Sequence, residues 1–186
     1  VLQPGTRMNS GFNFRYDLLP AGTLATPPSN LVYHATGTGH LFARTGWDVN
    51  AMWVAIVAGP YNESHAHQDQ GSFTLFSRDW LAVTANIWSH SGINQGTDVH
   101  NLVRFARNGT VARQCESTTK ISTMTVTPGA SGGDFTANAN LTPAFCDNTA
   151  VTSWRRQFTF AGRKLTVRDT FAMTSGTTAT FQVNTP

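Results

Sequence analysis

The segment "SHAHQDQGSF" at residues 64–73 carries the side chains best suited to chemistry. His65, His67 and Asp69 are spaced two residues apart, so on an extended backbone all three project to one face. Two imidazoles presented in this way suit a metal ion, and a carboxylate can join them as a ligand or orient one imidazole. The same residues also suit acid–base catalysis, and a polar turn before a strand is a third interpretation.

A metal ion at this segment would need ligands from elsewhere in the chain. His100 is the best candidate because it opens "HNLVRF", which resembles the start of another strand. If that strand lies beside a strand at 72–77, His67 and His100 can converge. We therefore predict that His67, His100 and Asp69 form the candidate metal set.

The elements that must position these residues are strands, because the apolar pattern has a period of two. Short turn signals separate them, and Asn108-Gly109 is the clearest hairpin turn. The pattern predicts an all-β fold, an antiparallel β-sandwich of about ten strands. The expected strands lie at residues 40–45, 51–59, 72–77, 80–88, 101–106, 110–117, 120–127, 134–141, 151–160, 164–173 and 178–183.

The chain has 186 residues, of which 40% are hydrophobic and 12% are charged, which suits one domain with a proper core. Residues 1–36 lack a sustained period, and we predict an extended arm or linker from a missing upstream domain. Residues 37–186 form the expected sandwich, truncated at both ends. A net charge of +3 without a basic cluster argues against nucleic acid, and no apolar run suits a membrane span.

The two cysteines, Cys115 and Cys146, lie in polar, turn-rich sequence without CxxC spacing. We predict a disulfide between them; a reactive or metal-binding thiol is the alternative. A disulfide implies an oxidising compartment, so the expected location is periplasmic or secreted.

The stretch "GHLFARTGWDVNAMWVAIVAGPYNESHAHQDQGSFTLFSRDWLAV", followed by "HNLVRF", resembles the heparinase II/III-like family of polysaccharide lyases. The matching features are Arg44, an apolar strand, the His-x-His-x-Asp motif running into Ser72-Phe73, and the later pair His100-Asn101. The resemblance covers roughly residues 37–183. Such lyases act on acidic, uronate-containing chains such as glycosaminoglycans and alginate.

The resemblance implies a super-sandwich-like β-domain that works with an upstream α/α toroid in the same protein. The implied reaction is β-elimination, in which a base removes the C5 proton and an acid protonates the departing O4 oxygen. His65 would be the catalytic residue facing the cleft, and Arg44 and Asn101 would bind substrate. The toroid would supply the remaining catalytic groups, so the isolated chain is expected to be inactive.

The resemblance also implies a structural zinc ion near the cleft, with His67 and His100 as ligands. The family's remaining ligand is usually an aspartate, and Thr84 stands at the corresponding place. Asp69 is the candidate that could complete the ligand set.

A non-catalytic carbohydrate-binding β-sandwich is the alternative function. Five tryptophans could stack on sugars, and Trp88, beside the polar loop 89–99, is the best candidate for substrate contact. A cupin-like metal enzyme ranks last, because the glutamate that usually follows His-x-His is missing.

Overall fold

A computed structural model describes residues 26–62, 66–85, 88–89, 92–93 and 95–186. None of the helical segments in these ranges is long and apolar enough to cross a membrane. The strands are β1 (Val32–Ala35), β2 (His40–Arg44), β3 (Met52–Val57), β4 (Phe73–Ser77), β5 (Asp79–Ala82), β6 (Trp88–Ser89), β7 (Gly92–Ile93), β8 (Val103–Arg107), β9 (Thr110–Val111), β10 (Thr123–Pro128), β11 (Phe135–Asn140), β12 (Val151–Ala161), β13 (Lys164–Met173) and β14 (Thr177–Phe181). Two short 3-10 helices, η1 (Thr97–Val99) and η2 (Thr142–Phe145), complete the elements.

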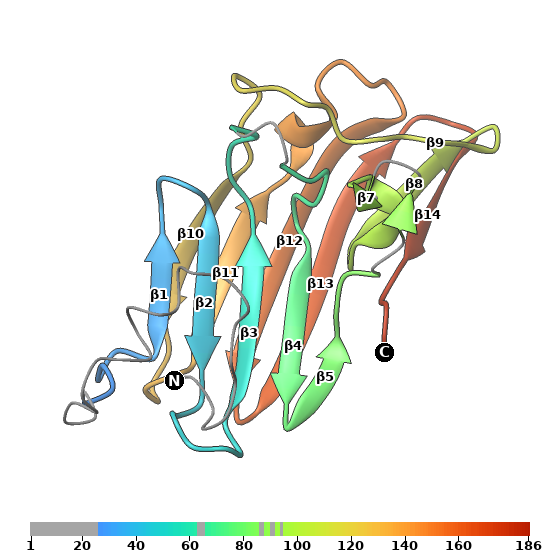
Figure 1. Cartoon of the computed structure of the whole chain (residues 1–186). Helices are drawn as coiled ribbons and strands as arrows, with labels where there is room; N and C mark the ends of the chain where they lie inside the picture. The colour runs from blue at the N-terminus through green and yellow to red at the C-terminus, as the bar shows by residue number, and fades with distance from the viewer. Residues whose placement is uncertain (1–25, 63–65, 86–87, 90–91, 94) are drawn as a thin grey trace, which may run out of the picture.

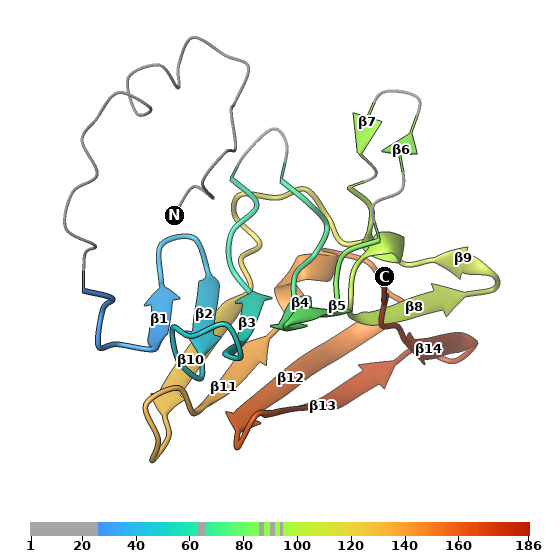
Figure 2. The same ribbon diagram turned by 60° about the horizontal axis from the view of Figure 1, so that its bottom comes forward.

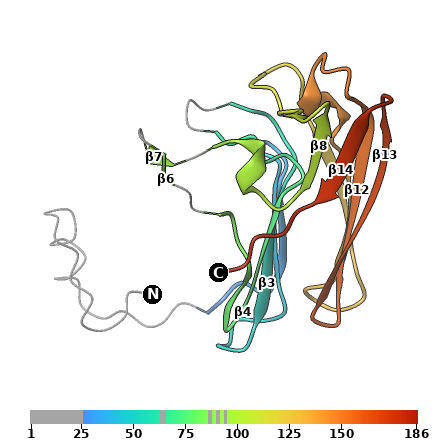
Figure 3. The same ribbon diagram turned by 90° about the vertical axis from the view of Figure 1, so that its right-hand side faces the viewer.

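Two antiparallel sheets form the layers of a β-sandwich (Figures 1 and 3). The first is a five-stranded meander, β1-β2-β3-β4-β5, and the second is a four-stranded meander, β10-β11-β12-β13. A three-stranded sheet, β14-β8-β9, and the small pair β6-β7 lie toward one end (Figure 2). The predicted all-β sandwich is therefore confirmed.

The core lies between the layers because every second residue of the long strands is apolar. On β12, Trp154, Phe158 and Phe160 point inward and are fully buried. Phe158 meets Phe73 of the first sheet edge-to-face, with ring centroids 6.3 Å apart. Phe105 of β8 packs in the same way on Trp154, which joins the third sheet to the sandwich.

The strongest predicted turn is present. Asn108 and Gly109 both have positive φ, 52° and 79°, as a two-residue turn between β8 and β9 requires. Most predicted strands are found, and 164–173 matches β13 in full.

Most strand ends differ from the prediction by one to three residues, and three differences are larger or change the organisation. β1 pairs with β2, so the sandwich begins before residue 37 and residues 32–35 do not belong to an arm. The strand expected at 80–88 ends at Ala82, because the backbone N–H of Val83 donates to Asn184 instead. The strand expected at 110–117 ends at Val111, because the Cys115 N–H donates to the Ala144 carbonyl at 2.7 Å.

A buried guanidinium crosses the core. Arg156 points inward from β12 and is 1% exposed. Its Nε and Nη2 donate to the Oδ1 and Oδ2 of Asp169 at 2.7 and 2.8 Å. Its Nη1 donates to the backbone carbonyls of Gly71 at 2.8 Å and Asn101 at 3.3 Å. Each of the three guanidinium nitrogens thus donates at least one hydrogen bond. A buried charge is stable only when it is hydrogen-bonded in this way.

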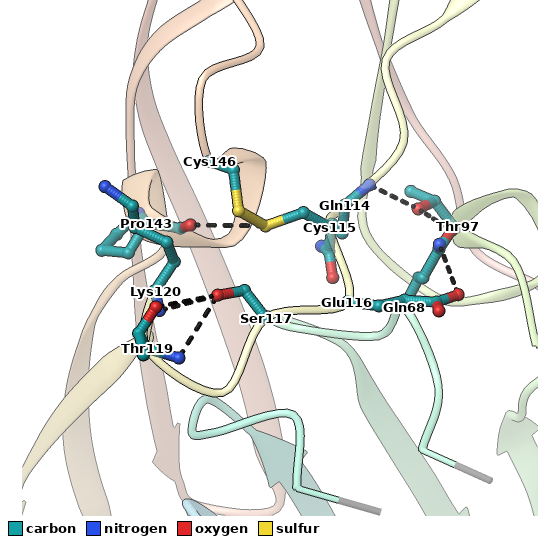
Figure 4. The surroundings of a disulfide bond; sticks show 10 residues. All are labelled: Gln68, Thr97, Gln114, Cys115, Glu116, Ser117, Thr119, Lys120, Pro143 and Cys146. Carbon is teal, nitrogen blue, oxygen red and sulfur yellow. Dashed lines mark hydrogen bonds between the residues drawn. A yellow bond between two sulfur atoms is a disulfide. The ribbon is translucent and has the colours of Figure 1, made fainter. Parts of the chain in front are cut away.

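The predicted disulfide joins Cys115 to Cys146 across a sequence separation of 31 residues (Figure 4). It ties the segment after β9 to the end of η2. The described chain has no free cysteine.

Arg156→Ala should lower the free energy of unfolding by about 3–5 kcal/mol, because it leaves the Asp169 carboxylate and two carbonyls without their donor. The neighbouring Arg155→Ala is the matched control, since Arg155 is exposed on the other face of β12. It should change stability by less than about 0.5 kcal/mol. Urea denaturation measures both, and equal effects would contradict the assigned role of Arg156.

Replacing both cysteines with serine should cost about 3–4 kcal/mol, because the unfolded chain regains the freedom of a loop of this length. Thermal unfolding of the double variant and of the reduced wild-type protein should give the same lowered midpoint. An unchanged midpoint in both would contradict a stabilising bridge.

Candidate functional site

The two histidine-bearing segments meet at one end of the first sheet, beside the connection from β3 to β4, and we call this end the histidine edge. His67 precedes β4 and His100 precedes β8, and His67 Nδ1 lies 3.2 Å from His100 Nε2. The predicted convergence of these two imidazoles is confirmed. The predicted reason is wrong, because β8 pairs with β9 and β14, while β4 pairs with β3 and β5. The link is instead the side chain of Asn101, whose Nδ2 donates to the Phe73 carbonyl at 2.7 Å.

Thr84 completes a chain of three side chains. Its Oγ1 lies 3.3 Å from Nδ1 of His100, so both ring nitrogens of His100 have a hydrogen-bonding partner. His100 is 1% exposed, whereas His67 remains partly exposed. The hydroxyl therefore orients the buried imidazole, which in turn positions the imidazole nearer to solvent.

Buried amides hold the two segments rigidly. Gln70 and Gln114 exchange hydrogen bonds of 2.8 Å between the backbone of Gln70 and the side chain of Gln114. The Gln70 Oε1 accepts from the Gly59 N–H at 2.6 Å, and the Gln114 N–H donates to Thr97 Oγ1 at 3.1 Å. The segment around His67 is thus fixed to the end of β3 and to η1, which leads to His100.

Gly71 explains why the motif can enter the core at this point. Its φ is +87°, and a side chain there would collide with Leu141 and Trp154. The close approach allows Arg156 to reach the Gly71 carbonyl. The glycine of the motif therefore has a packing role.

A cavity of about 240 Å³ opens beside the pair. His67 and Asp69 line it from the motif, and His40 lines it from the start of β2. Asn62 and Ala66, the described residues that flank the motif's first histidine, line it as well. The cavity is large enough for a part of a sugar ring and is bordered by imidazole, carboxyl and amide groups.

Burial shifts the titration of these groups towards their neutral forms. Burial, with a smaller effect of His67, lowers the pKa of His100 to about 4. Burial also lowers the pKa of His67, and it raises the pKa of the Asp69 carboxyl to about 7. Burial, followed by Glu116 and Asp69, raises the pKa of Tyr61. Near neutral pH the imidazole pair is therefore uncharged, and Asp69 can give or take a proton.

Two of the predicted site residues lie elsewhere or face inward. Arg44 lies at the far end of β2 from His40, with its guanidinium 3.9 Å from the ring centroid of Trp47. Asn101 is fully buried, and its Oδ1 accepts from the Asn184 N–H at 2.6 Å. Asn101 would have to leave these partners to bind substrate, and both substrate-binding roles stay predictions.

His65 and the Trp88 side chain lie outside the described residues, so their roles also stay predictions. Among the described tryptophans, Trp154 is buried, while Trp47 and Trp80 are exposed by 45% and 37%.

The described residues supply only part of a zinc site. The 3.2 Å between the two histidine nitrogens suits two ligands of one tetrahedral ion. A structural zinc needs four ligands, and in the described part of the chain no three His, Cys, Asp or Glu side chains group closely enough. Asp69 does not complete the pair, and Thr84 contacts the other nitrogen of His100. These residues alone do not fit a structural zinc site; the ion stays a prediction, and no step below depends on it.

His40, Gln70 and Gln114 belong to the site but were missed from the sequence. His40 reaches the cavity only because it pairs with Val57 at the end of β3. The pairing register between β2 and β3 brings His40 to the same end of the sheet as His67, and no local sequence motif encodes that register. Gln70 and Gln114 were missed because no pattern in the sequence links two positions that lie so far apart in the chain.

The site predicts opposite pH effects from two groups. His100 titrates near 6.5 when unfolded and near 4 when folded, so its contribution to stability is present above pH 6.5 and lost as the pH falls towards 4. Asp69 titrates near 3.8 when unfolded and near 7 when folded, so its contribution is present below pH 3.8 and lost as the pH rises towards 7.

Asp69→Asn removes the contribution of the Asp69 carboxyl to the pH dependence of stability. The contribution of His100 should then become visible. The unfolding free energy of the variant should rise by up to about 3 kcal/mol from pH 4 to pH 6.5, more steeply than that of the wild type. Urea denaturation across this range measures the difference. Asp147→Asn, which removes an exposed carboxylate, is the control. An identical pH profile for Asp69→Asn and wild type would contradict the assignment.

No protein-family model matches the sequence, and no curated protein matches it. Solved structures do share the fold. Heparinase III, in a form with methylated lysines and in a second structure, aligns with TM-scores of 0.61 and 0.62 at 17% and 18% identity. Both alignments cover 81% of this chain and 23% of heparinase III. A mutant of heparan sulfate lyase HepC from Pedobacter heparinus aligns with a TM-score of 0.60 at 19% identity, over 87% of this chain and 24% of that one. The chain thus has the fold of a region that makes up about a quarter of these lyases.

Proposed function

We propose that this chain is the β-sandwich part of a polysaccharide lyase that cleaves uronate-containing polysaccharide by β-elimination. The observation that carries the proposal is the meeting of His67 and His100 at 3.2 Å, beside a cavity, on a sandwich that shares its fold with heparinase III. The predicted disulfide is consistent with a periplasmic or secreted protein.

β-Elimination requires a base for the C5 proton, a donor for the departing oxygen, and a group that neutralises the uronate carboxylate. His65 is the proposed base, because its described neighbours Asn62 and Ala66 line the cavity. The Thr84–His100–His67 chain would hold this edge in place. The low pKa of buried His67 and His100 keeps both imidazoles uncharged and makes them poor bases, so they would support this edge rather than take the C5 proton.

The remaining catalytic groups would come from an upstream α/α toroid domain of the same protein. This part of the proposal agrees with the coverage of the solved lyases, since this chain spans 23% of heparinase III. The acidic polysaccharide would then lie between the toroid and the edge that carries the histidines.

The test is a lyase assay on the chain joined to its upstream sequence, with glycosaminoglycans and alginate as substrates. The ultraviolet absorbance of the unsaturated uronate product reports turnover. His65→Ala should lower kcat by about 10²–10⁴-fold, as the loss of a general base does. His34→Ala is the matched control, because His34 lies on β1, away from the cavity lining.

Turnover by the 186-residue chain alone would contradict the need for a partner domain. Full activity of His65→Ala would remove that residue from the mechanism. A longer protein that binds these polymers without forming unsaturated product would contradict the lyase assignment.

A further inference from the structure

The outward face of the second sheet, β10–β13, is polar over three successive rows of side chains. The strand register sets its side chains in three rows across the four strands. The rows are Thr123, Asn140, Arg155 and Thr170; then Thr125, Asn138, Gln157 and Arg168; then Thr127, Thr136, Thr159 and Thr166. We call these twelve residues the polar face. It contains hydroxyl, amide and guanidinium groups, and neither a carboxylate nor an apolar side chain.

The first two rows line a groove of about 410 Å³. Arg155 and Arg168 are both exposed and lie diagonally across β12 and β13, because Arg155 pairs with Thr170 and Gln157 pairs with Arg168. Diagonal neighbours in an antiparallel sheet are about 7–8 Å apart. The groove therefore presents two positively charged side chains from neighbouring strands.

Neither guanidinium is neutralised within the described chain. The ion pair found there joins Arg156 to Asp169, and both of these side chains lie on the inward side of the sheet. Two like charges on neighbouring strands repel each other, and an anion bound between them would reduce that repulsion. An anionic ligand bound at the two arginines would therefore lower the electrostatic energy of this face.

The amides of the groove supply further hydrogen-bonding groups. Gln157 Nε2 donates to Asn138 Oδ1 at 2.9 Å, which fixes both amides side by side. The Oδ1 of Asn140 is buried and accepts no hydrogen bond from any residue that the structure describes. A buried amide oxygen without a donor is costly, so a small turn of the Asn140 side chain that exposes this oxygen to a ligand hydroxyl would be favourable.

We propose that the polar face binds a linear acidic polysaccharide, with its carboxylate or sulfate groups on Arg155 and Arg168 and its hydroxyls on the amides and threonines. The groove runs across all four strands, which suits an extended chain. Nucleic acid fits less well, because the face lacks aromatic side chains on which bases stack. A protein partner fits less well, because the face has no apolar centre.

This site is separate from the histidine edge. The polar face points away from the first sheet, on the outer side of the second layer (Figure 3). It would hold a polymer on the protein without cleaving it. The inference does not depend on the proposed lyase activity, since a protein without that activity can still bind through this face.

The experiment measures binding of a sulfated uronate hexasaccharide to the full chain by calorimetry. The double variant Arg155→Gln/Arg168→Gln should raise Kd by about tenfold or more, because two charge-assisted hydrogen bonds are lost. Asn140→Asp keeps the shape of the groove and adds a negative charge, so it should also weaken binding. Circular dichroism melting checks that each variant remains folded.

The matched control is Arg78→Gln/Arg113→Gln, which removes the same charge from exposed positions outside the second sheet. It should leave Kd within about threefold of the wild-type value. The proposal is overturned if the wild type does not bind, if both double variants bind equally, or if duplex DNA of equal charge binds more tightly than the saccharide.

Discussion

The buried charge of Arg156 is the interaction on which the rest of the site depends. One guanidinium is held by Asp169 and donates to the carbonyls of Gly71 and Asn101. Those carbonyls belong to the two segments that carry His67 and His100. A charge in the core is stable only when all its hydrogen bonds are made, so the two segments must both be in place. The geometry of the histidine pair is therefore coupled to the stability of the sandwich.

The buried polar residues of the described chain gather around this point. Seven of the eight lie in the segments 69–72 and 97–101 or hydrogen-bond to them: Gln70, Ser72, Thr97, His100, Asn101, Gln114 and Arg156. This concentration of buried polar groups fixes the relative positions of the two segments, because each group must keep its hydrogen-bonding partner. The desolvation that these groups share also keeps His100 neutral and Asp69 partly protonated.

The sequence predicted correctly those features that a short sequence pattern determines. The period of two predicted the strands, Asn108-Gly109 predicted its turn, and the two cysteines predicted their bridge. The meeting of His67 and His100 was also predicted, although through a strand pairing that does not form. The features that the sequence did not predict depend on strand register and on contacts between residues far apart in the chain. His40 joins the cavity through its pairing with Val57, and β1 follows a sequence without a clear alternation.

The alternation of β12 connects the histidine edge with the polar face, the two surfaces for which we propose functions. Trp154, Arg156 and Phe158 point inward and build the support of the histidine edge, while Arg155 and Gln157 point outward into the polar groove. The phase of Trp154, Phe158 and Phe160 identifies Arg156 as the inward arginine from sequence alone. A shift of one residue along this strand would exchange the two arginines, bury Gln157 and expose three aromatic rings. The register that stabilises the core therefore also fixes the chemistry of both faces.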